Sequence, residues 1–491
     1  MDGKTPHIAM IPTPGMGHLI PLTELARRLT ESFNFSITIL LPNDGSTPSN
    51  STLSLLNSLP NSITHHFLPP ADISDLPQTA AVETRIILTL TRSLPQLRDS
   101  LRVISESTRF VALVTDHFGV SFFDLAKEFG ALPYMFFLSG ALGLCFGFEL
   151  PKLDKLYTCE YRDLPEPVRF CPGSVPVHGS DFIEPVQHRK SEAYKGMLDM
   201  AGRFYDVAGI FVNSFPDLEP AAFKYLNDEK IRDENKIPPV YSIGPVVKSG
   251  SESEPDGSRC IEWLDKQPRG SVLFVSFGSG GSLSHEQIVE LAHGLELSGV
   301  RFLWVFKRPN DKVSNASFFS VDNKMDDPLA FLPKGFLDRT NGLGLVVPSW
   351  APQVRVLSHG STGGFLTHCG WNSTMESVVH GVPMIAWPLF AEQKFNAVIL
   401  ADDLKVVARV KPNEEGLIKR EQIVEYVRSL MKGEEGEVMR YRMKDLKEKA
   451  ELALSEGGSS DKSLRKVAQV WMSHNRNEYC KNEADGVFPA A

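Results

Sequence analysis

One short segment restricts the fold more than any other part of the chain. Residues 364–367 form an apolar and β-branched run, and His368-Cys369-Gly370 follows as a tight turn. Asn, Ser and Thr cluster from Asn372 onward, which favours a helix start there, and Gly381-Val382-Pro383 marks the end of that helix. Residues 384–387 are apolar and form a second strand candidate. Strand, turn, helix and strand in this order predict a βαβ unit, and therefore a parallel sheet.

The same alternation extends through both halves of the chain, which predicts two α/β lobes. We expect helices at 21–30, 82–101 with a break near Pro95, 121–129, 191–208, 285–297, 419–431, 437–451 and 463–472, and irregular chain at 43–61, 151–187 and 308–329. We expect strands at 7–12, 35–41, 110–116, 132–138, 209–213, 271–277, 301–306, 364–367, 384–387 and 406–410.

The length of the chain supports two lobes. A chain of 491 residues is too long for a single core. The Ser-, Gly- and Glu-rich stretch that begins at Lys248 is the strongest linker candidate. The predicted fold is α/β, with two Rossmann-like lobes built on parallel sheets and a cleft between them. We place the first lobe at 1–247, the linker at 248–260, the second lobe at 261–462, and a closing helix with a frayed tail at 463–491.

Charge and cysteine content argue against several classes of partner. The formal net charge is −9 and the sequence has no basic tract, so nucleic acid and anionic membranes are not expected partners. The cysteines are scattered without a C-x-x-C pair, as in proteins that keep free thiols in a reducing compartment. No charged and apolar leader precedes His7, and no apolar run reaches ~18 residues. We therefore expect a cytoplasmic protein without a membrane span.

The predicted turn and helix near residue 370 have the features of an anion site. A helix N-terminus at the carboxyl edge of a parallel sheet presents free N–H groups and the positive end of the helix dipole. His368, Asn372 and Ser373 add side-chain donors at this point. Glu376 lies one helical turn beyond Asn372, where a carboxylate can accept hydrogen bonds from ribose hydroxyls, as in dinucleotide-binding folds.

Features on either side of this helix complete a nucleotide-sugar pattern. Trp350 offers a flat apolar face for a base, and Glu392-Gln393 supplies acceptors and donors for sugar hydroxyls. The stretch from Trp350-Ala351-Pro352-Gln353 to Gln393 resembles the signature of plant small-molecule UDP-glycosyltransferases. The likeness runs through nearly the whole chain. Leu150–Asp154 and Phe277–Gly281 resemble the subgroup that glucosylates hydroquinone, other phenols and monolignols.

This resemblance implies the two-lobed glycosyltransferase B architecture. The first lobe would bind the acceptor, the second would bind the UDP-sugar, and the last helix would return to the first lobe. Packing in the core is the alternative for Trp371, and helix capping is an alternative or additional role for Asn372 and Ser373. The donor-site residues implied by the resemblance are Ser279, Trp350, Ala351, Gln353, His368, Trp371, Asn372, Ser373, Glu376, Glu392 and Gln393, with Ser139 near the sugar 6-position.

A catalytic pair is expected in the first lobe. His18 follows a glycine turn at a strand end and precedes a helix, whose dipole disfavours the imidazolium and leaves a lone pair for a general base. Asp116 ends another buried strand and can reach the same sheet edge, where it would orient His18. The alternative for His18 is a capping or loop role, and the alternative for Asp116 is an N-cap of the helix predicted from Ser121. His117 could compete with His18, but strand alternation would point it elsewhere. In the resembled family the matching histidine and aspartate are catalytic, and direct displacement implies a β-glucoside.

The remaining expectations concern specificity and cofactors. Glu392 stands where the wider family has Asp, whereas Gln393 resembles the residue of enzymes that use glucose. The acceptor candidates, taken by matching position, are Glu83, Phe118, Phe148 and Phe390, and each aromatic could instead belong to the core. No D-x-D triplet or metal-ligand cluster occurs, so neither metal nor cofactor is expected, and the helix terminus would neutralise the diphosphate.

The expected function is UDP-glucose-dependent, inverting formation of β-O-glucosides of small phenols such as hydroquinone or a monolignol. The expected partners are UDP-glucose and a small phenolic acceptor, and the chain is expected to act as a monomer. Flavonoids, and xenobiotic phenols or anilines, are alternative acceptors.

A non-catalytic UDP-sugar-binding protein would make no use of His18 and Asp116. An NAD-dependent oxidoreductase is disfavoured because Ile20 replaces the third glycine of G-x-G-x-x-G, and a hydrolase because no G-x-S-x-G elbow occurs.

Overall fold

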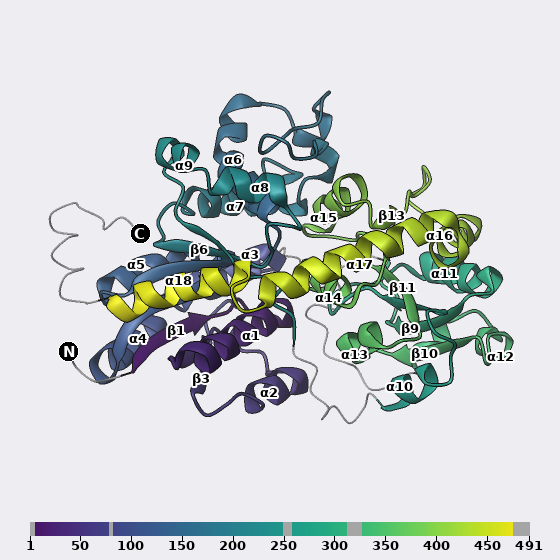
Figure 1. Cartoon of the computed structure of the whole chain (residues 1–491), viewed down its shortest axis with the longest axis horizontal. Helices are drawn as coiled ribbons and strands as arrows, with labels where there is room; N and C mark the ends of the chain where they lie inside the picture. Colours follow the sequence, from purple (N-terminus) through teal and green to yellow (C-terminus); the bar gives the residue numbers. More distant parts are fainter. Residues whose placement is uncertain (1–4, 78–81, 249–257, 312–326, 475–491) are drawn as a thin grey trace. The chain divides into compact units, whose positions relative to one another are not determined.

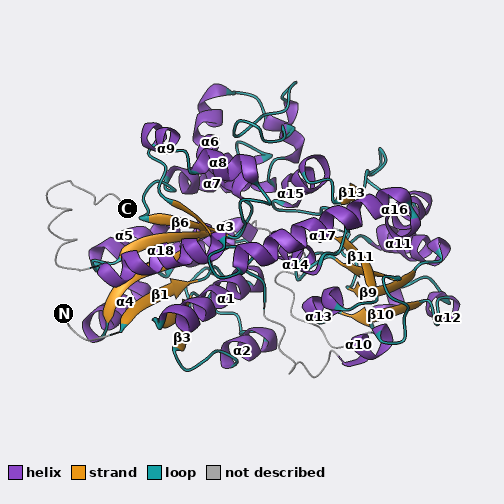
Figure 2. Cartoon of the chain, in the orientation of Figure 1, coloured by secondary structure: helices purple, strands orange, loops and turns teal. Residues whose placement is uncertain are grey.

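The computed structural model describes residues 5–77, 82–248, 258–311 and 327–474. The chain forms two compact units, and the predicted α/β class with parallel sheets is confirmed in each (Figures 1 and 2). Unit 1 comprises Met1–Ser180, Pro185–Val247 and Leu452–Ala491, and unit 2 comprises Asp181–Glu184 and Lys248–Glu451.

Unit 1 contains a seven-stranded parallel sheet with the strand order β3-β2-β1-β4-β5-β6-β7. Its strands are β1 (Pro6–Ile11), β2 (Ser36–Leu41), β3 (Ile63–Phe67), β4 (Arg109–Asp116), β5 (Leu132–Phe137), β6 (Gly209–Val212) and β7 (Val240–Ser242). Its helices are α1 (Met16–Phe33), α2 (Asn50–Asn57), α3 (Val82–Arg92), α4 (Leu94–Ser107), the 3₁₀ helix η1 (His117–Phe122), α5 (Phe123–Glu128), α6 (Ala141–Leu156), α7 (Glu192–Gly202), α8 (Pro220–Leu226), α9 (Glu229–Asn235) and α18 (Ser459–Ser473).

The core of unit 1 includes the last helix of the chain. β1 and β4 are buried along almost their whole length and mostly apolar, as is typical of strands covered by helices on both faces. Trp471 of α18 is fully buried, and its indole ring lies edge-on to Tyr134 at 5.0 Å and to Phe211 at 5.9 Å between ring centroids. Residues near the end of the chain therefore pack on strands from its first half (Figure 1).

Unit 2 contains a six-stranded parallel sheet with the order β10-β9-β8-β11-β12-β13. Its strands are β8 (Val272–Ser276), β9 (Arg301–Phe306), β10 (Gly344–Pro348), β11 (Thr362–Thr367), β12 (Met384–Ala386) and β13 (Val407–Arg409). Its helices include α10 (Ser258–Leu264), α11 (His285–Ser298), α12 (Phe336–Arg339), α13 (Gln353–Ser358), α14 (Trp371–His380), α15 (Gln393–Val398), the π-helix η8 (Ile399–Asp403), α16 (Arg420–Lys432) and α17 (Glu434–Leu454), of which residues 452–454 are assigned to unit 1.

Both sheets share one topological feature that determines where ligands can bind. The strand order changes direction between β1 and β4 in unit 1, and between β8 and β11 in unit 2. The loops that leave the carboxyl ends of such neighbouring strands diverge to opposite faces and open a crevice. Each unit therefore has one favoured ligand position, at the carboxyl ends of these two strands.

Several elements differ from the sequence-based expectations. Helix α1 begins at Met16 instead of residue 21, because Gly15, with φ 127°, ends the preceding turn and Pro21 is accommodated inside the helix. Helix α2 lies in a stretch expected to be irregular, and α6 extends to Leu156. Strands β3, β7 and β10 were not anticipated. Most of the predicted linker, residues 312–326 of the predicted long loop, and the predicted tail lie outside the described residues.

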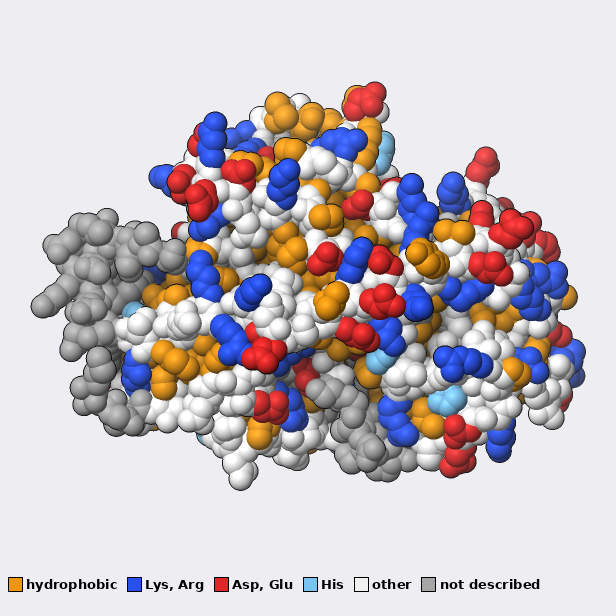
Figure 3. Space-filling model, viewed as in Figure 1, with side chains coloured by type: hydrophobic (Ala, Val, Ile, Leu, Met, Phe, Trp, Pro, Cys, Tyr) orange, Lys and Arg blue, Asp and Glu red, His pale blue; other side chains and the backbone are white. Residues whose placement is uncertain are grey.

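The surface carries charges of both signs. Figure 3 shows Lys and Arg side chains interspersed with Asp and Glu on the face in view, with hydrophobic side chains scattered among them. Within the four described ranges, none of the helices combines the length and the apolarity that crossing a membrane requires.

Candidate active site

His18 and Asp116 meet at the crevice of unit 1. Asp116 is the last residue of β4, and His18 lies in the first turn of α1, which follows β1. His18 Nδ1 lies 3.1 Å from Asp116 Oδ2, although 98 residues separate the two in the chain. The Asp116 side chain is fully buried, whereas the His18 side chain is 16% exposed. The predicted pair is therefore assembled at the β1–β4 switch point.

Asp116 is held as a carboxylate by a dense set of donors. Thr13 donates its backbone N–H to Oδ2 at 2.7 Å and its hydroxyl to Oδ1 at 2.6 Å, and the Phe118 N–H donates to Oδ1 at 3.0 Å. Burial alone would raise the pKa of Asp116, but His18, His117 and Thr13 outweigh it and lower the pKa to about 2. An ionised Asp116 favours the His18 tautomer with the proton on Nδ1, which leaves a lone pair on Nε2.

The position of His117 corrects the sequence-based expectation. Its ring centroid lies 6.0 Å from that of His18, 4.5 Å from Phe118 and 5.2 Å from Phe137. Strand alternation does not apply to this residue, because β4 ends at Asp116 and His117 begins the 3₁₀ helix η1. Burial lowers the pKa of His117 to about 4, so its imidazole is neutral at physiological pH.

The other unit 1 candidates lie at varying distances from this pair. Phe118 packs edge-on against His18 at 5.7 Å between ring centroids. Ser139 follows β5, which neighbours β4, and Glu83 lies in the first turn of α3, which packs against η1. Phe148 is 1% exposed and packs against Phe204 and Tyr205, so the structure places it in the core.

In unit 2, His368 lies between two glycines at the β8–β11 switch point. A Cβ atom at Gly278, in the loop after β8, would fall 2.4 Å from His368 Nε2, and one at Gly370 would fall 2.5 Å from it. Only glycine allows the backbone to approach the imidazole this closely. Burial and the charge of Lys307 lower the pKa of His368 to about 3, so the imidazole is neutral. Ser279 is the exposed residue next in this loop.

Gln353 links two more candidates. It opens α13, and its Nε2 donates to Ser373 Oγ at 2.8 Å and to Glu376 Oε2 at 2.7 Å, both on α14. Burial raises the pKa of Glu376 to about 7, opposed by the hydrogen bond from Gln353. Asn372, like Ser373, lies in the first turn of α14, and Gly370 is the N-cap of this helix. Gln353, Ser373 and Glu376 therefore form one hydrogen-bonded cluster along the first two turns of α14.

The predicted sugar-binding residues are fixed by local hydrogen bonds. Gln393 is 3% exposed, and its Oε1 accepts the N–H groups of Leu389 at 2.8 Å and Phe390 at 3.1 Å. Its Nε2 has no acceptor among the residues that the structure describes. Asn396 Nδ2 donates to Glu392 Oε1 at 3.2 Å and to the Cys369 carbonyl at 2.9 Å, which ties α15 to the turn before α14.

The two tryptophans differ in exposure. Trp350 is 45% exposed, beside Ala351, which is 7% exposed. Trp371 is 2% exposed, which agrees with its alternative assignment as a packing residue. A flat exposed indole at the carboxyl end of β10 is therefore available to stack on a base.

The sequence reasoning missed Thr13, Asn396 and Lys307. Each contacts a predicted site residue or its loop through a tertiary hydrogen bond. The only available signal was that Thr13 and Lys307 directly follow predicted strands. Within the described part of the chain, His, Cys, Asp and Glu side chains form no group of three or more that could hold a metal ion.

Comparisons with known proteins identify the family to which the chain is similar. The sequence model of the family described as "UDP-glucoronosyl and UDP-glucosyl transferase" matches residues 247–441. The chain is 55% identical to the hydroquinone glucosyltransferase of Rauvolfia serpentina, over 95% of this chain and 98% of the relative.

Solved structures are similar over nearly the full length. One is Phytolacca americana UGT2 complexed with UDP-2fluoro-glucose and pterostilbene, at 49% identity and a TM-score of 0.87, covering 96% of this chain and 100% of that chain. Another is a complex between a UDP-glucosyltransferase from Polygonum tinctorium, capable of glucosylating indoxyl, and 3,4-dichloroaniline, at 47% identity and a TM-score of 0.88 with the same coverage.

Proposed function

The chain belongs to the plant UDP-glycosyltransferase family, and we propose that it transfers glucose from UDP-glucose to the hydroxyl group of a small phenol. It is a hexosyltransferase with the glycosyltransferase B fold of that family. In this proposal unit 1 holds the acceptor and unit 2 holds the UDP-sugar.

The observation that carries the proposal is the His18–Asp116 pair. Asp116 is buried and ionised, it accepts from four donors, and it orients His18 Nδ1. A protein that only bound UDP-sugars would gain nothing from such a pair, whereas a transferase needs a base for the acceptor hydroxyl. A phenolic hydroxyl is more acidic than an aliphatic hydroxyl, so an imidazole is a strong enough base to accept its proton.

The reaction balances without a further reactant. His18 Nε2 takes the proton of the phenolic hydroxyl as the oxygen attacks the anomeric carbon of glucose. The bond between that carbon and the β-phosphate oxygen breaks, and UDP leaves with the bonding electron pair. Attack from the side opposite UDP inverts the α-linked sugar to a β-glucoside. Asp116 stabilises the imidazolium that forms.

The leaving diphosphate has several donors in unit 2. The N-terminus of α14 offers N–H groups together with the side chains of Asn372 and Ser373, and neutral His368 offers a ring N–H. Glu376 and Gln353 are assigned to the ribose, and Trp350 to the uracil. Glu392 and Gln393 are assigned to the glucose hydroxyls, with the Gln393 Nε2 as donor and the Glu392 carboxylate as acceptor.

The acceptor class is supported by the relatives and by the aromatic ring that lies beside His18. Phe118 lies against the His18 ring and offers an aromatic surface beside the proposed base. The hydroquinone glucosyltransferase and the pterostilbene complex both concern phenols. The 3,4-dichloroaniline complex makes an aromatic amine the second acceptor class to test.

Product analysis tests the proposal. The purified full chain is incubated with UDP-glucose and hydroquinone, a monolignol, pterostilbene or 3,4-dichloroaniline, and products are separated by chromatography with mass detection. We expect phenol products heavier by one hexose, with the anomeric proton coupling of a β-glucoside. His18→Ala should abolish O-glucosylation and leave UDP affinity unchanged. Absence of any glucoside despite normal UDP binding would refute the proposal.

A further inference from the structure

Lys307 is a residue to which neither the family signature nor the proposed mechanism assigns a role. We propose that Lys307 is a positioning residue for the donor diphosphate, which turns two peptide units of the loop after β8 so that their N–H groups bind the phosphates. This inference rests on the proposed function, because it assumes that unit 2 binds a UDP-sugar.

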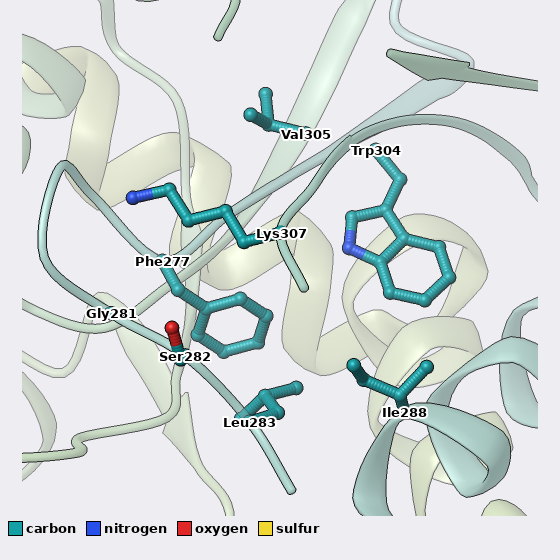
Figure 4. Close-up of a pocket in the computed structure, with 8 residues that line it drawn as sticks. All are labelled: Phe277, Gly281, Ser282, Leu283, Ile288, Trp304, Val305 and Lys307. Carbon is teal, nitrogen blue, oxygen red and sulfur yellow. The ribbon is translucent and has the colours of Figure 1, made fainter. Parts of the chain in front are cut away.

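The contacts of Lys307 are made to backbone carbonyls. Lys307 directly follows β9, and its Nζ donates to the carbonyl of Gly278 at 2.5 Å and to the carbonyl of Ser279. Figure 4 shows the Lys307 side chain extended alongside Phe277, with Nζ at the end away from Trp304. One ammonium group therefore holds two consecutive peptide units of the loop.

The orientation of the loop follows from peptide geometry. In a trans peptide the C=O and N–H groups point in opposite directions. The carbonyls of Gly278 and Ser279 point at Lys307, so the N–H groups of Ser279 and Gly280, which belong to the same peptide units, point away from it. Neither N–H has a hydrogen-bond acceptor among the described residues. Two adjacent N–H groups directed to one side, after a glycine with φ 71°, are a known arrangement for binding anions.

The same loop lies against His368. Gly278 approaches the imidazole so closely that a Cβ there would overlap Nε2. The N–H groups of Ser279 and Gly280 therefore lie near the turn that leads into α14, at the β8–β11 switch point. A diphosphate at the N-terminus of α14 would be within the reach of both the helix and the loop.

The charge of Lys307 adds to this effect. The side chain is partly buried, and burial lowers its pKa to about 8, so the ammonium form still predominates at neutral pH. No carboxylate partner of Lys307 lies among the described residues, and its donors are used on carbonyls. A cation behind the loop polarises both peptide units and increases the positive potential of their N–H groups.

Binding measurements on the folded full chain test this role. The variants are Lys307→Met, Lys307→Gln and Lys307→Arg, and the matched control is Lys432→Met, which removes an exposed lysine at the end of α16. For each we would measure thermal unfolding, the Kd for UDP by calorimetry, and steady-state kinetics with both substrates varied. Lys307→Gln keeps one donor and provides a second variant if Lys307→Met does not fold.

We expect Lys307→Met to raise the Kd for UDP and the KM for UDP-glucose about tenfold or more, the loss typical of a charge-assisted hydrogen bond. The KM for the phenol should change less than about twofold. For Lys307→Gln, the Kd for UDP and the KM for UDP-glucose should lie between those of the wild type and of Lys307→Met. Lys307→Arg, which can donate to both carbonyls, should restore donor affinity. A folded Lys307→Met or Lys307→Gln variant with the control's UDP affinity would overturn the proposal, as would failure of Lys307→Arg to restore binding. Failure of the wild-type chain to bind UDP would instead refute the proposed function.

Discussion

Thr13 donates a hydrogen bond to each oxygen of the Asp116 carboxylate, from its backbone N–H to Oδ2 and from its hydroxyl to Oδ1. The same Oδ2 also meets His18 Nδ1. Thr13 therefore helps to determine which way the carboxylate faces, although the proposed mechanism gives Thr13 no contact with the substrate.

Removing the Thr13 hydroxyl should weaken catalysis without affecting donor binding. We expect Thr13→Val, which keeps the side-chain shape and the backbone N–H, to lower kcat about tenfold, because a hydrogen bond to a charged group contributes roughly 1.5–3 kcal/mol. The measurement is steady-state kinetics with UDP affinity as the control. Thr13→Ser should retain kcat, and equal losses in Thr13→Ser and Thr13→Val would point to packing instead.

Replacing the orienting carboxylate should have a larger effect. Asp116→Asn keeps the shape of the side chain but can donate a hydrogen bond to Nδ1, which would favour the wrong tautomer of His18. In a comparable catalytic triad this change lowers kcat by about 10⁴. We expect a loss of at least about 10²-fold in phenol glucosylation, with thermal unfolding as the check on folding. Near-normal kcat would remove Asp116 from the mechanism.

Glu376 should make the stability of the protein depend on pH. Burial raises its pKa to about 7, whereas a carboxyl in the unfolded chain titrates near ~4.3. Between these values the folded state holds a proton that the unfolded state lacks, so stability falls as pH rises through this window. We expect Tm to fall more steeply from pH 5 to pH 8 in the wild type than in Glu376→Gln. Parallel Tm curves for the two proteins would contradict the raised pKa.

Gln393→His should erode the preference for UDP-glucose. The Gln393 Oε1 accepts two backbone N–H groups of the preceding turn, which leaves Nε2 for the proposed hydrogen bond to the sugar. An imidazole cannot reproduce both functions. Competition between UDP-glucose and UDP-galactose, read from product ratios, should show the glucose preference reduced about tenfold, the magnitude of one hydrogen bond. An unchanged ratio would exclude Gln393 from sugar recognition.

Most strands with an apolar run could be predicted from the sequence, including the short strands β6, β12 and β13, whereas β3, β7 and β10 could not. β9 was predicted with its observed bounds because Arg301–Phe306 is a continuous apolar run after one charged residue. β7 is only Val240–Ser242 and follows two prolines, and β3 contains His65 and His66, so neither has an apolar pattern of its own. Pairing with a neighbouring strand, rather than local sequence, makes these segments extended.

The residues of the candidate site also fall into two groups, those that could be selected from the sequence and those that could not. Residues at strand ends and helix starts, such as His18 and Asp116, could be selected because sequence position implies the sheet edge. The direction of the His117 side chain was predicted wrongly, because His117 already belongs to the 3₁₀ helix η1 and the alternation of side chains along a strand does not extend to it. Lys307 acts on a loop 28 residues away through two carbonyls, and no residue pattern encodes such a contact.

The exposure of Trp350 provides a built-in optical reporter. Of the other tryptophans, Trp263 is partly buried and Trp304, Trp371, Trp387 and Trp471 are 4% exposed or less, so Trp350 should account for most of the red-shifted, solvent-quenchable fluorescence. Stacking of uracil on this indole would quench that component without any label. The emission of the unmodified protein could then be used to follow donor binding on the stopped-flow timescale.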